Sequence, residues 1–183
     1  MKQSKLFAAV LLIFILGCNG NSVGPSNGTT SGHATLSTTL VNNNGVGFSF
    51  SKGDTVVISN SSIIRADIST LVQTNDAGAI LGVFLSAIPF RQAFRLMYAA
   101  TDPDSAKIYF TNLKEFTDST YSDLAIPVIV NQVWVVKTHD DKYAKILITN
   151  TMAYIDSTVP SAPTMFGKVT FDWTYQPNGE RTF

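Results

Sequence analysis

Apolar and polar residues alternate in short segments over most of the chain, with the period of two that is typical of β-strands. Segment 48–51 alternates in this way, and the β-branched segment 55–59 follows it after a Lys-Gly-Asp sequence at 52–54. Because glycine and aspartate favour turns, this pair of segments predicts a β-hairpin. A further strand is predicted over residues 63–68, which are again rich in isoleucine.

A second hairpin is predicted in the C-terminal third of the chain. Segments 133–138 and 142–148 are rich in β-branched and aromatic residues, and the polar residues 139–141 join them. Two such segments on either side of a short polar turn are expected to pair as antiparallel strands.

The last strand signal covers residues 167–175, where apolar and polar residues alternate without a break. The alternation places four apolar side chains on one face, Val169, Phe171, Trp173 and Tyr175. We expect this face to be buried, because each aromatic ring covers on the order of 150–250 Å². The proline and the Asn-Gly pair of segment 176–179 predict a turn, after which residues 180–183 return as a short terminal strand.

The middle of the chain is less regular. Residues 77–97 are largely apolar, and Gly82 and Pro89 would weaken a single long helix. We expect buried strand and loop there, with a helical turn over residues 91–98. Segment 103–116 predicts a helix, because proline suits the first helical position and apolar residues recur on one face.

The N-terminus differs from the rest of the chain. Lys2 and Lys5 precede an unbroken apolar run over residues 6–16, and Gly17 and Cys18 follow it. This arrangement predicts a secretory signal peptide over residues 1–17, since the run is shorter than the roughly 20 apolar residues that span a bilayer.

The four residues Ile-Leu-Gly-Cys that end at Cys18 resemble a bacterial lipobox, in which the cysteine becomes the lipidated first residue of the mature protein. We therefore expect cleavage before Cys18 and anchoring to a membrane by lipid, which is stable when two or more acyl chains are attached. The alternative is an ordinary signal peptide followed by an unrelated cysteine. Cys18 is the only cysteine, so no disulfide is expected.

Residues 18–35 are rich in Gly, Ser, Asn and Thr, which predicts a flexible tether that contains a solvated His33. Residues 36–183 then form the single domain. A hydrophobic content of 45% with 14% charged residues is typical of a globular domain. The net charge is +0 and the basic residues are scattered, which argues against nucleic acid as a partner.

Two C-terminal segments carry a resemblance to a known family. The sequences VWVVKTHDDKYAKILI and GKVTFDWTYQPNGERTF resemble the C-terminal half of HmuY-like lipoproteins, exported haem-binding proteins of Bacteroidetes-type bacteria. Upstream, FSFSKGDTVVIS followed by ADI resembles the beginning of the family's domain, whereas the region between is dissimilar. The resemblance implies a mainly β domain of two packed antiparallel sheets with few short helices. It also implies haem capture and delivery to a TonB-dependent outer-membrane receptor.

Haem iron is held by His, Met, Cys or Tyr side chains. The best-known family members use two histidines, one of them before the second hairpin, but residues 116–127 contain neither His nor Met. His139 lies in the predicted turn of that hairpin, where we expect it to be solvated. Since some relatives are thought to use methionines, the other candidate ligands are Met97, Met152, Met165 and, as a phenolate, Tyr121. The alternative is that the methionines fill gaps in the core.

No nucleophile, zinc or phosphate-binding motif is present in the sequence, so we do not expect an enzyme. Two hypotheses therefore stand. The chain is a membrane-anchored haem-binding lipoprotein, or it is a non-haem surface or periplasmic lipoprotein with a protein or glycan partner. Asn19 is not the aspartate that favours inner-membrane retention in enteric bacteria, which favours the outer membrane.

Overall fold

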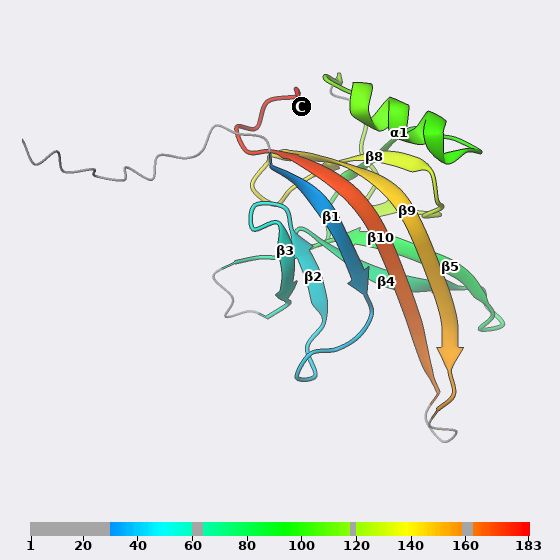
Figure 1. Cartoon of the computed structure of the whole chain (residues 1–183). Helices are drawn as coiled ribbons and strands as arrows, with labels where there is room; N and C mark the ends of the chain where they lie inside the picture. Colours follow the sequence, from blue (N-terminus) through cyan, green and yellow to red (C-terminus); the bar gives the residue numbers. More distant parts are fainter. Residues whose placement is uncertain (1–29, 60–63, 118–119, 159–162) are drawn as a thin grey trace, which may run out of the picture.

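The computed structural model describes residues 30–59, 64–117, 120–158 and 163–183. Within these residues the chain forms two antiparallel five-stranded sheets that pack face to face, together with one helix (Figure 1). This confirms the predicted fold class. The predicted signal peptide, Cys18 and the first part of the predicted tether lie outside the described residues.

Strands from both ends of the chain form the first sheet. Its order is β1 (Thr30–Ser37), β10 (Thr164–Gln176), β9 (Tyr143–Asp156), β8 (Gln132–Lys137) and β6 (Phe94–Ala99). The order of the second sheet is β3 (Asp54–Val57), β2 (Val46–Ser49), β4 (Ile68–Thr74), β5 (Ile80–Ala87) and β7 (Leu124–Ala125). The pairs β2–β3 and β8–β9 are the two predicted hairpins, which the structure confirms.

Aromatic side chains from both sheets form the centre of the core. The ring of Phe48 lies 5.2 Å from that of Phe50, 5.4 Å from that of Phe171 and 5.5 Å from that of Trp173, in each case edge to face. Val169 and Phe171 are completely buried, and Trp173 is nearly so. The apolar face predicted for residues 167–175 is therefore confirmed as the face that packs on the second sheet.

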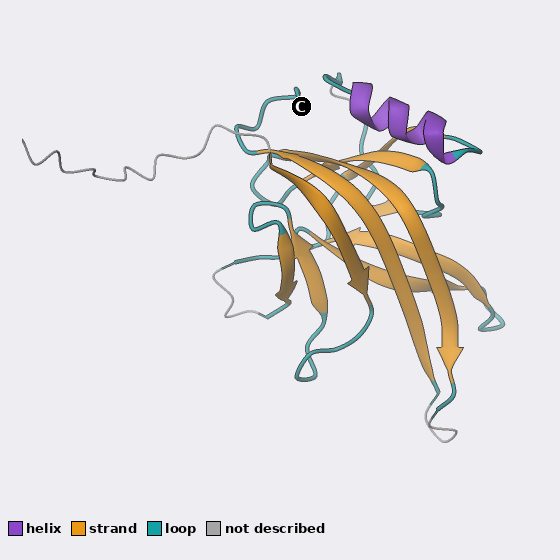
Figure 2. Ribbon diagram, in the orientation of Figure 1, coloured by secondary structure: helices purple, strands orange, loops and turns teal. Residues whose placement is uncertain are grey.

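The helix α1 (Pro103–Asn112) lies over the outer face of the first sheet, at the end that also holds the C-terminus (Figure 2). Asp102 caps the helix, since its carboxylate accepts a hydrogen bond of 2.8 Å from the main-chain N–H of Ser105. Ala106 and the adjoining Leu113 are buried in the same apolar cluster as residues of β8 and β9. The predicted helix is confirmed, although it ends four residues before position 116.

Lys145 of β9 is buried beneath the last turn of this helix. Its ammonium group donates hydrogen bonds of 2.8 Å to the main-chain carbonyls of Phe110 and Leu113, and it lies 4.9 Å from the ring centroid of Phe110. Burial, and secondarily the charge of Lys114, lower the pKa of Lys145 to about 8. The lysine thus binds the carbonyls of the helix C-terminus, but its charge is costly there.

The lowered pKa of Lys145 predicts a pH-dependent stability. The unfolded chain binds a proton at Lys145 up to about pH 10.5 and the folded chain only up to about pH 8, so deprotonation favours folding. We expect the free energy of unfolding to rise by about 1–2 kcal/mol between those values, allowing for partial solvent screening. Tyr175 has a pKa raised to about 12 by burial, so it weakens the fold only above its usual pKa of 10.0.

Urea unfolding across pH 8 to 10 measures this effect, and the Lys145→Met variant should lose the rise. Lys107→Met, on the exposed side of α1, is the matched control and should retain it. An identical slope for the parent chain and Lys145→Met would contradict the prediction.

Four expectations from the sequence are wrong in the structure. Residues 30–35 belong to β1 and not to a flexible tether. Each of them pairs with a residue of β10, from Tyr175 opposite Thr30 to Thr170 opposite Thr35. Only Leu36 in this strand is fully buried, so an edge strand with polar side chains gave no alternating signal. His33 is exposed as expected, but its ring Nδ1 lies 2.7 Å from a carboxylate oxygen of Asp172.

The other three corrections concern strand positions. The strand predicted over 63–68 begins only at Ile68, because Asp67 turns its side chain inward, and position 63 lies outside the described residues. Residues 94–99 are strand β6 and not a helical turn, since their backbone pairs with β8. Residues 180–183 do not form a strand but contribute one isolated bridge, between Glu115 and Thr182.

Candidate functional site

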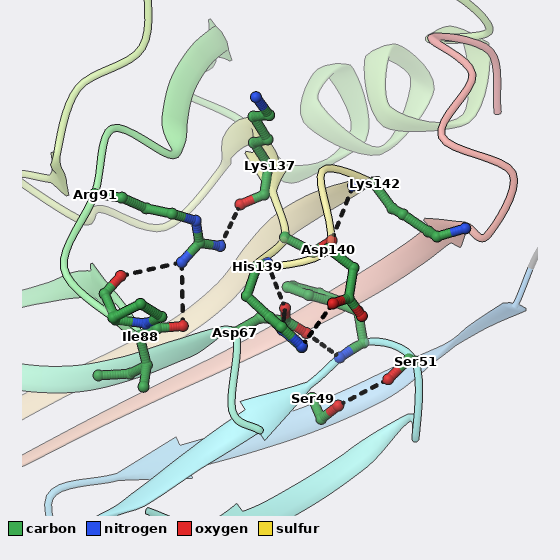
Figure 3. A network of polar contacts seen from close by, with 12 residues as sticks. Ser49, Ser51, Asp67, Ile88, Arg91, Lys137, His139, Asp140 and Lys142 are labelled. Carbon is green, nitrogen blue, oxygen red and sulfur yellow. Dashed lines mark hydrogen bonds and ion pairs between the residues drawn. The ribbon is translucent and has the colours of Figure 1, made fainter. Parts of the chain in front are cut away.

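The two ends of the sandwich differ in their chemistry. At one end a group of polar residues, here called the inter-sheet cluster, links the two sheets and consists of Asp67, Arg91, His139 and Asp140 (Figure 3). At the other end β9 and β10 continue beyond the rest of the first sheet as a two-stranded hairpin (Figure 1).

Asp67 is the centre of the inter-sheet cluster and is almost completely buried, with 1% of its surface exposed. One carboxylate oxygen accepts a hydrogen bond of 2.8 Å from the main-chain N–H of Phe50. The other accepts two from His139, at 3.0 Å from the main-chain N–H and at 2.7 Å from Nδ1 of the ring. Asp67 precedes β4 in the second sheet and His139 follows β8 in the first, so these bonds join the sheets.

His139 is therefore not the solvated turn residue that the sequence predicts. Its side chain is only 15% exposed, and its Nε2 lies 3.0 Å from a carboxylate oxygen of Asp140. Carboxylate oxygens thus face both ring nitrogens, and neither nitrogen points toward a position where a haem iron could bind. The turn is held inward because Asp67, which is distant in sequence, needs donors for its buried charge.

Arg91 makes a second link between the sheets at the same end. Its guanidinium donates hydrogen bonds of 3.1 Å to the main-chain carbonyls of Ile88 and Pro89 and one of 2.7 Å to that of Lys137. Burial lowers the pKa of Arg91, and the charge of Asp67 opposes that effect. Asp67 and Arg91 thus bind groups that belong to both sheets, which favours a structural role for the inter-sheet cluster.

The projecting hairpin forms the open end. Pairing of β9 with β8 ends at Leu147, and pairing of β10 with β1 ends at Lys168. Beyond these residues the two strands pair only with each other up to Asp156 and Thr164. The base of this extension packs on the second sheet at Ala153 and Gly167, whereas its tip exposes apolar side chains such as Tyr154, Ile155 and Met165.

Register determines which side chains share each face of this hairpin. Met152 lies opposite Lys168 and Tyr154 opposite Phe166, so these four side chains share the outer face of the first sheet. The rings of Tyr154 and Phe166 are in contact, with centroids 4.9 Å apart. Met165 lies on the inner face, and both methionines are about half exposed, at 44% for Met152 and 53% for Met165.

A groove of about 340 Å³ runs beside the hairpin, between the edges of the two sheets. Its walls are residues 80–83 of β5 and residues 151–153 of β9, and its remaining lining is Val128 and Ile129. Three of these side chains expose large apolar surfaces, Leu81, Ile129 and Met152. The groove and the outer face of the hairpin therefore meet at Met152.

The structure brings few of the predicted haem ligands together. Met152 and Met165 lie on opposite faces of the hairpin. Met97 and Tyr121 pack against the apolar cluster beneath α1, and Met97 lies level with the end of the β8–β9 pairing. At about 3.3 Å per residue, Met152 is roughly 16 Å further along β9. No two methionines face each other across a common slot in the described part of the chain.

Several residues of these sites were not identified from the sequence. Asp67 and Lys145 carry buried charges, and no local pattern distinguishes them from exposed residues. Lys168 and Phe166 could have been placed beside Met152 and Tyr154 only if the register of the last hairpin had been known. In this part of the chain the sequence predicted strands only over residues 142–148 and 167–175, so the projecting part of the hairpin was not predicted.

Other kinds of site receive no support from the described residues. Among them, no three His, Cys, Asp or Glu side chains gather in a way that could hold a metal ion. None of the helices in the described ranges has the length and apolar character needed to cross a membrane. No protein-family model matches the chain, and no curated protein does.

Proposed function

We propose that this chain is an exported, non-enzymatic lipoprotein of the HmuY-like type that binds haem at the outer face of the β9–β10 hairpin. One observation carries the proposal: Met152, Tyr154, Phe166 and Lys168 occupy adjoining cross-strand positions on one exposed face. Haem is a flat, largely apolar ligand with an iron centre and two carboxylates. An aromatic pair, a thioether and an ammonium group match the flat apolar ring, the iron and the carboxylates, respectively.

If these residues bind haem, a single side chain of the protein would hold the iron. Met152 would hold the iron, Tyr154 and Phe166 would cover one side of the porphyrin, and Lys168 would pair with a carboxylate. The groove next to Met152 offers further apolar contact through Leu81 and Ile129. When bound, haem would supply the iron chemistry, and the chain would orient it and shield part of it from water.

The lipobox-like sequence at Cys18 and the following Gly- and Ser-rich segment support a lipid-anchored carrier on the outer membrane. A carrier held in this way would deliver its ligand to a membrane partner, for which we propose a TonB-dependent receptor. An exposed, one-sided ligand site suits such delivery, because a second protein can reach the ligand without opening the fold.

Haemin titration of residues 19–183 tests the ligand, with absorbance read in both oxidation states. We expect a saturable, sharpened Soret band, and we expect Met152→Ala to weaken binding roughly tenfold or more because the side chain that would hold the iron is lost. Met165→Ala is the matched control, since Met165 is about equally exposed on the opposite face of the same hairpin. Equal effects of the two substitutions would contradict a site at Met152.

A second candidate function is a non-haem binding lipoprotein with a protein or glycan partner. The observation in its favour is that the hairpin exposes apolar side chains on both faces, with Ile155 and Met165 on the inner one. Haem covers one face only, whereas a protein partner would cover both. A broad Soret band equal to that of free haemin would favour this second function.

A further inference from the structure

A groove of about 220 Å³ lies at the end of the sandwich that holds the inter-sheet cluster. It runs between the end of β3, residues 64–66 and the segment 88–89 that follows β5. The main-chain N–H of Ile88 donates a hydrogen bond of 2.8 Å to the carbonyl of Asp67, which places the groove beside the inter-sheet cluster. The projecting hairpin is at the other end of the domain (Figure 1).

The walls of this groove are aliphatic. Its apolar lining consists of Val57, Ile58, Ile64, Ala66, Ile88 and Pro89. Val57 and Ile64 leave large parts of their side chains exposed, whereas Ala66 is buried. Among the described residues that line the groove there is no aromatic ring, so a flat ligand finds no stacking partner. These walls suit a saturated chain.

Main-chain groups in the walls are already in use. The N–H of Ile58 donates a hydrogen bond of 2.8 Å to the carbonyl of Gly45. The carbonyls of Ile88 and Pro89 each accept one of 3.1 Å from the guanidinium of Arg91 (Figure 3). A peptide terminus is usually captured by several free main-chain groups, so this groove is poorly suited to a peptide.

The charge in the lining is that of Arg65, which is exposed. Arg91 and Arg95 bind main-chain carbonyls, whereas Arg65 makes no hydrogen bond or ion pair within the described part of the chain. No Asp or Glu is among the described residues that line the groove. A guanidinium without an internal partner can bind a carboxylate through two parallel hydrogen bonds.

Hollows beside other cations do not combine these features. The hollow beside Lys114 also contains Glu115, whose negative charge opposes the binding of an anion. The hollow beside Lys107 is lined by residues of α1 alone, with Ile108 as its apolar side chain. The groove at Arg65 thus offers an unopposed positive charge together with apolar walls from three segments of the chain.

We propose that this groove binds a medium-chain fatty acid, with the carboxylate at Arg65 and the alkyl chain between Val57, Ile64 and segment 88–89. A cavity of about 150 Å³ holds the six carbons of benzene, so a groove of this volume has room for roughly eight or nine carbons. The site shares no residue with the proposed haem site, and it therefore stands or falls independently of haem binding.

Calorimetric titration with sodium octanoate and with 1-octanol tests the proposal. The protein is the chain from residue 19 to residue 183, which contains both sheets and their shared core. We expect octanoate to bind saturably and roughly fivefold to tenfold more tightly than octanol, because only octanoate carries a charge for Arg65. In Arg65→Gln the two ligands should bind equally well.

Lys168→Gln is the matched control, since it removes a positive charge at the other end of the domain and should retain the preference for octanoate. Chain length is a second measure of the site. From butanoate upward the affinity should rise about threefold to fourfold per methylene and level off near nine carbons, where the groove is full.

Three results would overturn the proposal. The first is an equal affinity of Arg65→Gln and the parent chain for octanoate. The second is a loss in Lys168→Gln as large as that in Arg65→Gln, because the carboxylate would then lie at the hairpin. The third is an affinity that does not depend on chain length, since the aliphatic walls would then make no contact with the ligand.

Discussion

Replacing Asp67 by alanine is expected to lower the free energy of unfolding by about 3–5 kcal/mol, because it removes one partner from a buried charged network. The substitution leaves the main-chain N–H groups of Phe50 and His139 and the ring Nδ1 of His139 without their acceptor. These groups are buried or nearly so, and little water can replace the carboxylate. The two sheets would also lose a direct link at the end of the sandwich that holds the inter-sheet cluster.

Urea unfolding followed by tryptophan fluorescence measures this loss. Asp141→Asn is the matched control, since Asp141 lies in the same turn region but its side chain is 81% exposed and pairs with Lys137. Asparagine removes the charge and tolerates the left-handed backbone of this position, where φ is 56°. We expect that substitution to cost no more than about 1 kcal/mol. If Asp67→Ala and Asp141→Asn were equally stable, the inter-sheet cluster would not hold the sheets together.

The sequence could predict the local strand pattern of this chain but not the contact between Asp67 and His139. The hairpin of β8 and β9 and the face of β10 were predicted correctly because alternation and turn residues act over a few positions. Asp67 and His139 are separated by 72 positions, and only the packing of the two sheets brings them together. A histidine in a turn was therefore expected to be solvated, although the fold supplies it with a buried carboxylate.

The methionines illustrate a related limit. Met152 and Met165 are both candidate haem ligands from the sequence, and their closeness along the chain is compatible with a shared site. Shifting a strand by one residue exchanges its faces, so only the register of β9 on β10 shows that they point in opposite directions. The same register groups Met152 with Lys168, a pairing that composition alone does not suggest. Site prediction in such a fold thus depends on register more than on residue type.

Register also explains why Gly47 is expected to be irreplaceable. The hairpin of β2 and β3 joins β4 through two residue pairs, of Gly47 with Ser69 and of Phe48 with Ile68. A Cβ atom at position 47 would lie 2.4 Å from the Cβ of Ala66 and 2.7 Å from the main-chain oxygen of Ile68. Neither neighbour can rotate away, because one is a methyl group on the backbone and the other is the backbone itself.

Gly47→Ala should therefore force β2 away from β4 and displace Phe48 from the centre of the aromatic core. Since overpacking against backbone lies at the upper end of its usual range, we expect a loss of about 3 kcal/mol or more in the free energy of unfolding. Gly45→Ala is the matched control two positions away, because its new Cβ would meet only the side-chain tip of Ile58, at 3.5 Å. Urea unfolding of both variants decides the matter: comparable midpoints would mean that β2 can move at little cost, and that the contact between β2 and β4 does not position the core.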